Sequence, residues 1–328
     1  MANYPQFDNA RGVWNMKEVY NAVMGGYWPN ALSRGICAGG VTPTKVNIIE
    51  YITMSSAGNA TDFGDTIASS PRCGGSSHTR ALFGGGYTPT KIGTIDYITM
   101  STTGDAADFG DLTAASYSVA HAGNSVRCVF GGGGSPRRNI IDYVTIASLG
   151  DAVDFGDMSV DRENAYSMSS PTRGVFAGGS PGTSNVIDYI TIASTGDATD
   201  FGDAVTGRVA HGTTSSSTRG IFGGGGSPTH LSSIEYITIA STGNAVKYGD
   251  LIAATDRMGS GTGNSVRGFF AGGVAPALSN VIQYIIIPNG GTAVDFGDLS
   301  AARKDLGMAS QSHGGLNDGY QGAPRIGA

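Results

Sequence analysis

The sequence predicts an all-β protein made of six similar four-stranded sheets. Composition supports strands, because Ile outnumbers Leu by 24 to 10 and β-branched side chains favour the pleated surface of a sheet. The glycine content, 53 of 328 residues, fits short strands joined by tight turns. The strongest observation is an arginine that recurs at intervals of 46 to 48 residues, and its six copies are Arg34, Arg80, Arg127, Arg173, Arg219 and Arg267.

Each repeat keeps the same internal register. Two glycines follow the arginine, a tyrosine comes 16 or 17 residues after it, and a second aromatic residue stands twelve residues beyond the tyrosine. An aspartate always follows that aromatic residue by two positions. In the fourth repeat the aromatic residues are Tyr189 and Phe201, and the aspartate is Asp203. A period of about 40–50 residues is typical of repeat architectures.

Every repeat contains four candidate strands. The first is rich in Ser, Thr and Gly, as in residues 210–218, and the second contains the arginine and the glycine pair, as in residues 173–179. The third alternates apolar and polar residues, as in 186–192, and the fourth covers residues such as 198–203. Gly196, in the turn before the fourth strand, can take a positive φ at little cost. Short strands at this spacing predict an all-β closed assembly.

The chain ends favour a ring over a linear array. The first repeat enters directly at Arg34, without the glycine-rich strand that precedes the arginine elsewhere. Residues 307–313 match that missing strand but lead into no further repeat. We therefore expect them to join the first sheet and to close a six-bladed β-propeller. A linear solenoid would need polar, atypical caps, which the sequence lacks.

The repeats resemble those of kelch-type β-propellers in the double glycine, the strand tyrosine and the second aromatic residue, although Phe stands where kelch repeats usually have Trp. The repeat that begins at Arg173 (R-G-V-F-A-G-G … I-D-Y-I-T-I-A-S-T-G-D-A-T-D-F-G-D) is also similar to propeller repeats in virion proteins of marine tailed bacteriophages, including cyanophages. The segment that begins at Gly12 (G-V-W-N-M-K-E-V-Y … Y-W-P) is similar to short N-terminal elements of phage fibre and virion proteins. The resemblance implies a structural protein of the virion, in a tail fibre or another appendage, that is made in the host cytoplasm.

We expect three parts: an N-terminal docking segment (residues 1–33), the propeller (34–313) and a tail (314–328). Asn15 and Glu18 have the spacing of a helix capping box, which predicts a short helix after them. This segment either packs against the propeller or docks on other virion proteins. Its candidate docking residues are Trp14, Val19, Tyr20, Val23, Tyr27 and Trp28.

Several function classes are disfavoured. The net charge of −6 argues against a protein that neutralises nucleic-acid phosphates, and no apolar run reaches the roughly 18–20 residues of a membrane helix. Three cysteines are too few for a disulfide framework. The histidines lack zinc-ligand spacing, so we expect no metal site or cofactor. No residue stands out as a nucleophile with its base, so we expect no enzymatic activity.

Two kinds of repeated acid need an explanation. The aspartates of the turns, such as Asp151 and Asp197, do not follow a calcium-loop pattern, and we expect them to accept hydrogen bonds from backbone N–H groups. A second polar residue, an acid in five of the six repeats, precedes each strand tyrosine, and we expect a cross-strand pair between the acid and the repeated arginine. Its six copies are Glu50, Asp96, Asp142, Asp188, Glu235 and, as the exception, Gln283.

The loops divide into a uniform set and a variable set. The turns between first and second strands and between third and fourth strands barely change among the copies, whereas the other loops vary and carry basic and aromatic residues. The variable loops lie on one rim of a propeller, where recognition is common. Host-surface glycan or protein is the expected partner of this rim, and a second copy of the chain is another. There are three alternatives. The loops of this rim vary because the face has no function, or the protein is a kelch-like interaction module unrelated to virions, or it is a glycan-acting enzyme. The candidate rim residues are Lys45, Arg72, Tyr117, Arg137, Arg138, Arg162, His230, Arg257 and Arg303.

Overall fold

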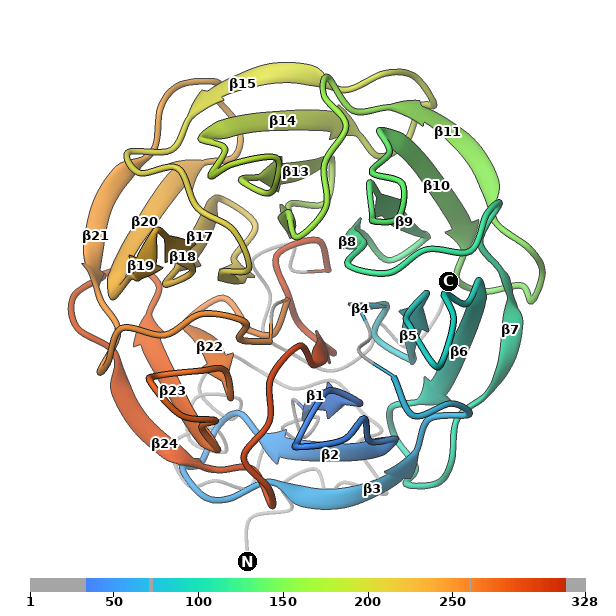
Figure 1. Ribbon diagram of the computed structural model, residues 1–328, viewed down its shortest axis with the longest axis horizontal. Helices are drawn as coiled ribbons and strands as arrows, with labels where there is room; N and C mark the ends of the chain where they lie inside the picture. Colours follow the sequence, from blue (N-terminus) through green and yellow to red (C-terminus); the bar gives the residue numbers. More distant parts are fainter. Residues whose placement is uncertain (1–33, 71–72, 260, 317–328) are drawn as a thin grey trace, which may run out of the picture.

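A computed structural model describes residues 34–70, 73–259 and 261–316. The described residues form a six-bladed β-propeller around a single axis (Figure 1). They include no α-helix, and therefore none that could cross a membrane. The helix expected near the N-terminus lies outside the described residues. The fold class predicted from the repeats is confirmed.

Each blade is an antiparallel sheet whose strands follow one another outward from the axis (Figure 1). The first blade holds β25 (Gly307–Ser310), β1 (Arg34–Ala38), β2 (Ile48–Thr53) and β3 (Thr61–Asp65). The second holds β4 (Cys73–Ser76), β5 (Arg80–Gly84), β6 (Thr94–Thr99) and β7 (Ala107–Asp111). The third holds β8 (Ala120–Gly123), β9 (Arg127–Gly131), β10 (Ile140–Thr145) and β11 (Val153–Asp157). The fourth holds β12 (Tyr166–Ser169), β13 (Arg173–Ala177), β14 (Val186–Thr191) and β15 (Thr199–Asp203).

The last two blades carry small irregularities. The fifth holds β16 (Gly212–Ser215), β17 (Arg219–Gly223), β20 (Ser233–Thr238) and β21 (Val246–Asp250), with a short hairpin of β18 (Gly226–Ser227) and β19 (Thr229–His230). The sixth holds β22 (Arg267–Ala271), β23 (Val281–Ile286) and β24 (Val294–Asp298). Its inner position is taken by a segment that forms isolated bridges with β22, Gly259 to Ala271 and Gly263 to Gly268.

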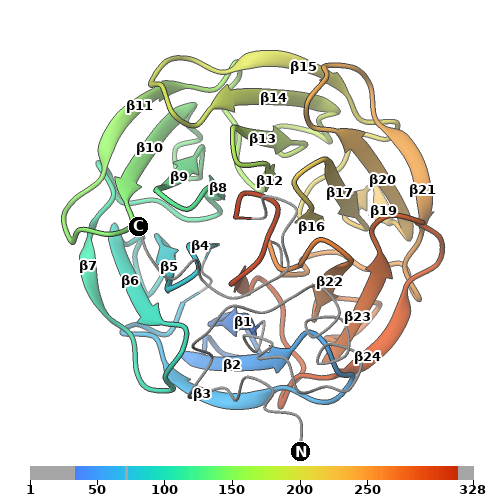
Figure 2. The same ribbon diagram turned by 180° about the vertical axis from the view of Figure 1, so that it is seen from behind.

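The ring closes between the two ends of the chain. Strand β25 pairs antiparallel with β1, from Gly35 opposite Ser310 to Ala38 opposite Gly307. The predicted closure by the C-terminal strand is confirmed, although the strand itself ends at Ser310. The following residues continue across the axis (Figures 1 and 2). Closure gives β1 a partner on its inner side and so removes an exposed sheet edge.

The hydrophobic core lies between the blades. Ile36 and Phe63 of the first blade pack in one buried cluster with Phe83 and Ile98 of the second. Phe63 is the extra residue at an irregularity between β2 and β3, where Ile49 faces Gly64 and Glu50 faces Asp62. A bulge of this kind re-aims a side chain, and here the aromatic ring is buried. Such a cluster is built from the facing side chains of two adjacent blades, so each blade is buried against its neighbour.

The repeated arginine links each blade to the next one. The guanidinium of Arg80 lies 4.9 Å from the centre of the Tyr97 ring in its own blade. Its Nη1 donates a hydrogen bond of 2.8 Å to the backbone oxygen of Ile146 in the third blade. The same bond recurs around the ring, and its other donor–acceptor pairs are Arg34–Met100, Arg127–Ile192, Arg173–Ile239, Arg219–Ile287 and Arg267–Met54.

The expected cross-strand pair between this arginine and the repeated acid is therefore wrong. The acid instead accepts the backbone N–H of the segment that enters its blade, as Asp188 does from Ser159 at 3.3 Å. The side chain of Gln283 makes the same contact with the N–H of Ile252 at 2.9 Å. In three blades the acid also binds a buried arginine of that entering segment, and these pairs are Arg162–Asp188, Arg208–Glu235 and Arg303–Glu50.

The turn aspartates act as the sequence predicted. Oδ1 of Asp151 accepts a 3.0 Å hydrogen bond from the backbone N–H of Asp111, at the end of the outer strand of the preceding blade. Asp105 and Asp197 make the equivalent contact. The outer edges of adjacent blades are thus joined by carboxylate–backbone bonds.

Candidate functional site

The variable loops form a ring at one end of the axis, and a series of backbone hydrogen bonds joins five of the segments that enter the blades. Non-glycine residues with φ near +53° occupy the same position in five entering segments, and they are Ser118, Asn164, Ala210, Arg257 and Asp305. Each residue after Ser118 donates its N–H to the carbonyl of the one before it, from Asn164 to Ser118 at 3.3 Å through Asp305 to Arg257 at 2.9 Å. Left-handed backbone is unusual for such residues. The ring holds their side chains around the mouth of the axis.

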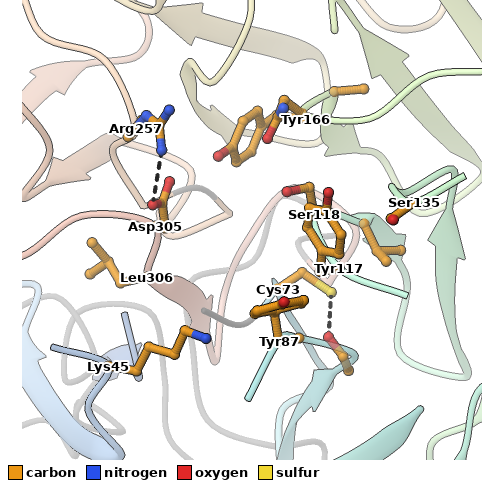
Figure 3. A pocket seen from close by; sticks show the side chains of 15 residues that line it. Lys45, Cys73, Tyr87, Tyr117, Ser118, Ser135, Tyr166, Arg257, Asp305 and Leu306 are labelled. Carbon is orange, nitrogen blue, oxygen red and sulfur yellow. Dashed lines mark hydrogen bonds and ion pairs between the residues drawn. The ribbon is translucent and has the colours of Figure 1, made fainter. Parts of the chain in front are cut away.

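A pocket of about 430 Å³ opens inside this ring (Figure 3). Its lining side chains come from the first four blades and from the sixth, and it falls within the usual size range of ligand sites. Figure 3 shows three tyrosines, Tyr87, Tyr117 and Tyr166, around the pocket, with Arg257 and Asp305 together on one side. The pocket therefore combines aromatic and charged groups.

The aromatic wall is built by three neighbouring blades. Tyr87, in the loop after β5, makes an edge-to-face contact with Tyr117, and their ring centres are 5.6 Å apart. Nζ of Lys45, in the loop after β1, lies 4.2 Å from the centre of the Tyr87 ring. Tyr87 remains 43% exposed, so its ring is available to a ligand.

The opposite side holds an ion pair at the edge of the cavity. Nη1 of Arg257 lies 3.5 Å from Oδ2 of Asp305. Burial raises the pKa of Asp305, and the charge of Arg257 opposes that shift. Burial also raises the pKa of Tyr166 well above its usual range, with a smaller contribution from the Asp305 carboxylate. Tyr166 is therefore a neutral hydroxyl that can donate and accept hydrogen bonds.

Three of the predicted rim residues, Lys45, Tyr117 and Arg257, come together in this pocket. Arg137 is exposed on a neighbouring loop. Arg138 donates to the carbonyls of Ala114 and Ala115 at 3.2 and 3.0 Å, in the segment that enters the third blade.

The other predicted rim residues lie elsewhere. Nδ1 of His230 is 3.4 Å from a carboxylate oxygen of Asp256. Arg162 and Arg303 are fully buried, so assigning them to an exposed binding rim is wrong. Their guanidinium groups neutralise the buried acids described above. Arg72 and all the candidate docking residues (Trp14, Val19, Tyr20, Val23, Tyr27 and Trp28) lie outside the described residues.

Sequence reasoning missed Tyr87, Tyr166 and Asp305. Tyr166 had a usable signal, because a small residue (Gly, Ala or Cys) occupies its position in the other repeats, for example Gly212. Asp305 follows Lys304 at the position that Arg257 occupies in the preceding repeat. Comparison within the chain would have selected Tyr166, whereas the position of Asp305 varies among the repeats (Ser118, Asn164, Ala210 and Arg257) and gives no such signal.

The C-terminal residues cover the other end of the axis. Nε2 of His313 lies 2.9 Å from the carbonyl of Ser76, and Nδ1 accepts a hydrogen bond from the N–H of Gly315 at 3.0 Å. The ring is therefore neutral with its proton on Nε2. Residues 313–316 are all buried. The tail expected from residue 314 thus begins inside the channel, and the pocket is open from the variable rim.

No known protein family matches the chain, and no curated protein sequence matches it.

Proposed function

We propose that the protein is a non-enzymatic structural component of a tailed-phage virion, in a tail fibre or another appendage. Residues 1–33 dock it on other virion proteins, and the pocket-bearing end faces a glycan or protein of the host surface. The chain is made in the host cytoplasm and functions in the particle.

The proposed binding role is supported mainly by one observation, which is that the two ends of the propeller differ in their loops and in their accessibility. The end with uniform turns is covered by residues 313–316, whereas the other end presents diverse side chains around a pocket. A rigid ring of blades that displays variable loops is a common arrangement for recognition. The virion assignment is supported by the resemblance of the repeats and of the segment that begins at Gly12 to phage virion proteins.

Immunogold labelling of purified phage particles tests the proposal. We expect label on an appendage when the particles carry the full chain. Removal of residues 1–33 should abolish incorporation while the purified propeller keeps its circular-dichroism spectrum and its melting temperature. Particles without label, from lysates that contain the chain, would contradict the virion role and favour the kelch-like interaction module.

A further inference from the structure

Lys45 is half-buried, and its ammonium group has no charged partner among the described residues. Its contact is with the ring of Tyr87, and among the described residues it makes no ion pair and no side-chain hydrogen bond. The equivalent residue of the next blade, Lys91, belongs to the same T-P-T-K motif but donates to the carbonyl of Ser135 at 2.7 Å. Lys45 is therefore available to an anion in the pocket.

The charges of the whole pocket favour an anion as well. Two cationic residues, Lys45 and Arg257, line it with one carboxylate, Asp305, which gives two positive charges against one negative charge. The chain as a whole carries −6. The lining side chains therefore carry a net positive charge in a chain that is acidic as a whole, and a positive mouth favours anionic ligands.

The remaining lining suits a sugar ring. The rings of Tyr87 and Tyr117 offer apolar surface to the C–H face of a pyranose, and their hydroxyl groups can bond to its hydroxyls. Tyr166, Ser118 and Asn164 add further donors and acceptors around the same space. A cavity of about 430 Å³ admits a few linked sugar units, whereas a folded protein surface is too broad to enter it.

We propose that the axial pocket binds an anionic sugar unit of a glycan, with the sugar ring against Tyr87 and Tyr117 and the anionic group beside Lys45. This inference rests on the proposed binding role of this end and names its ligand. The anionic group is a carboxylate or a sulfate, since a lysine ammonium recognises either as a point charge. An acidic peptide is the competing ligand.

Calorimetric titration of the full chain tests the inference with three matched galactose trisaccharides: neutral, uronic acid and 6-sulfated. We expect at least one anionic trisaccharide to bind about tenfold more tightly than the neutral one, equivalent to about 1.4 kcal/mol. Lys45→Gln should remove that preference, and Lys91→Gln, the matched control, should keep it. Added salt should weaken binding to the wild-type chain more than binding to Lys45→Gln.

Three outcomes would overturn the inference. They are equal binding of neutral and anionic trisaccharides, equal losses in Lys45→Gln and Lys91→Gln, and displacement of the sugar by an acidic peptide at the same concentration. A second variant, Tyr87→Leu, separates the ring contact from the charge, because it should weaken all trisaccharides alike. These measurements use the purified chain, whereas particle labelling tests the proposed function. The inference can therefore be contradicted while the virion role stands, and the reverse is also true.

Discussion

Arg162 donates a hydrogen bond to Oδ2 of Asp188, and both side chains are fully buried. The arginine lies in the segment that enters the fourth blade, and the acid lies on β14 of that blade. The pair therefore fixes the connection between two blades to the sheet that follows. Breaking a buried pair by removing one partner is strongly destabilising, because the other charge is left without compensation.

The sixth blade contains a neutral version of this contact. Thr255 takes the place of the arginine, and Gln283 takes the place of the acid while keeping the bond to the N–H of Ile252. We expect Arg162→Thr alone to lower the free energy of unfolding by about 3–5 kcal/mol. Arg162→Thr combined with Asp188→Gln should cost less than Arg162→Thr alone. Urea unfolding of the two single variants and the double variant measures this, and simple additivity would contradict it.

Replacement of the repeated arginine should lower the free energy of unfolding more than replacement of an exposed arginine. Arg80→Met removes the hydrogen bond to Ile146 and the contact with the Tyr97 ring, and it leaves a carbonyl without its donor. We expect a loss of about 1.5–3 kcal/mol in the free energy of unfolding, the range for a hydrogen bond to a charged group. Arg137→Met, at an exposed position, is the control and should lie within about 0.5 kcal/mol of the wild-type chain.

The sequence predicted the blades because their register repeats without a break. The spacing of arginine, tyrosine and aspartate defines each sheet. Segment 307–313, which resembles a first strand but leads into no further repeat, indicated how the ring closes. The partner of the repeated acid could not be read in the same way. Asp188 meets an arginine 26 residues before it, and only the folded blade brings those two positions together. Gln283 is visible in the sequence as an exception, but nothing local connects it with Thr255, which stands 28 residues before it.

The pocket was only partly predictable for a related reason. Loop variability identified the end of the axis where the pocket lies, and it selected Lys45, Tyr117 and Arg257, which line that pocket. Variability alone does not separate side chains that converge on the axis from those that turn into the protein. Arg162 and Arg303 belong to the second group. Burial of an arginine depends on an acid from a distant strand, which no local pattern displays.

Glycines on the outer strands are required by the neighbouring blade. At Gly110, φ is +148°, and a Cβ would lie 2.4 Å from the carbonyl oxygen of Gly150. Gly104 has nearly the same φ, +150°, but a Cβ there would meet nothing within 4 Å. We expect Gly110→Ala to cost about 1–3 kcal/mol more than Gly104→Ala, since only the former adds a clash to backbone strain. Equal melting temperatures for the two variants would exclude this packing argument.

Ring closure can be tested by shortening the chain. Truncation after Leu316 keeps β25 and the residues that cover the channel, so the melting temperature should stay close to that of the full chain. Truncation after Leu306 removes β25, including the fully buried Met308, and exposes the edge of β1. We expect that chain to unfold or to aggregate, as unpaired sheet edges do. A monomeric, folded product in size-exclusion chromatography would mean that closure by β25 is dispensable.

The propeller should lose stability in acid because three histidines are buried in the neutral form. Burial lowers the pKa of His121 from 6.5 to about 3 and that of His313 to about 4. Burial together with the charges of Arg208 and Arg162 holds the pKa of His211 well below its usual range. In the unfolded chain these rings regain a pKa near 6.5. Their contribution is therefore complete above that pH and is lost as the pH falls toward the folded values.

Each of the three histidines should lower the free energy of unfolding by about 1.4 kcal/mol per pH unit below 6.5. Asp142 and Asp305 act in the opposite sense, because burial raises their pKa, but only at the acidic end of the range. Urea unfolding midpoints between pH 7.5 and pH 5 measure the slope. His211→Leu should reduce the slope by about one third, since neither ring nitrogen of His211 has a hydrogen-bond partner among the described residues and the variant removes only a titrating group. A slope unchanged in that variant would show that His211 is not a source of the acid sensitivity.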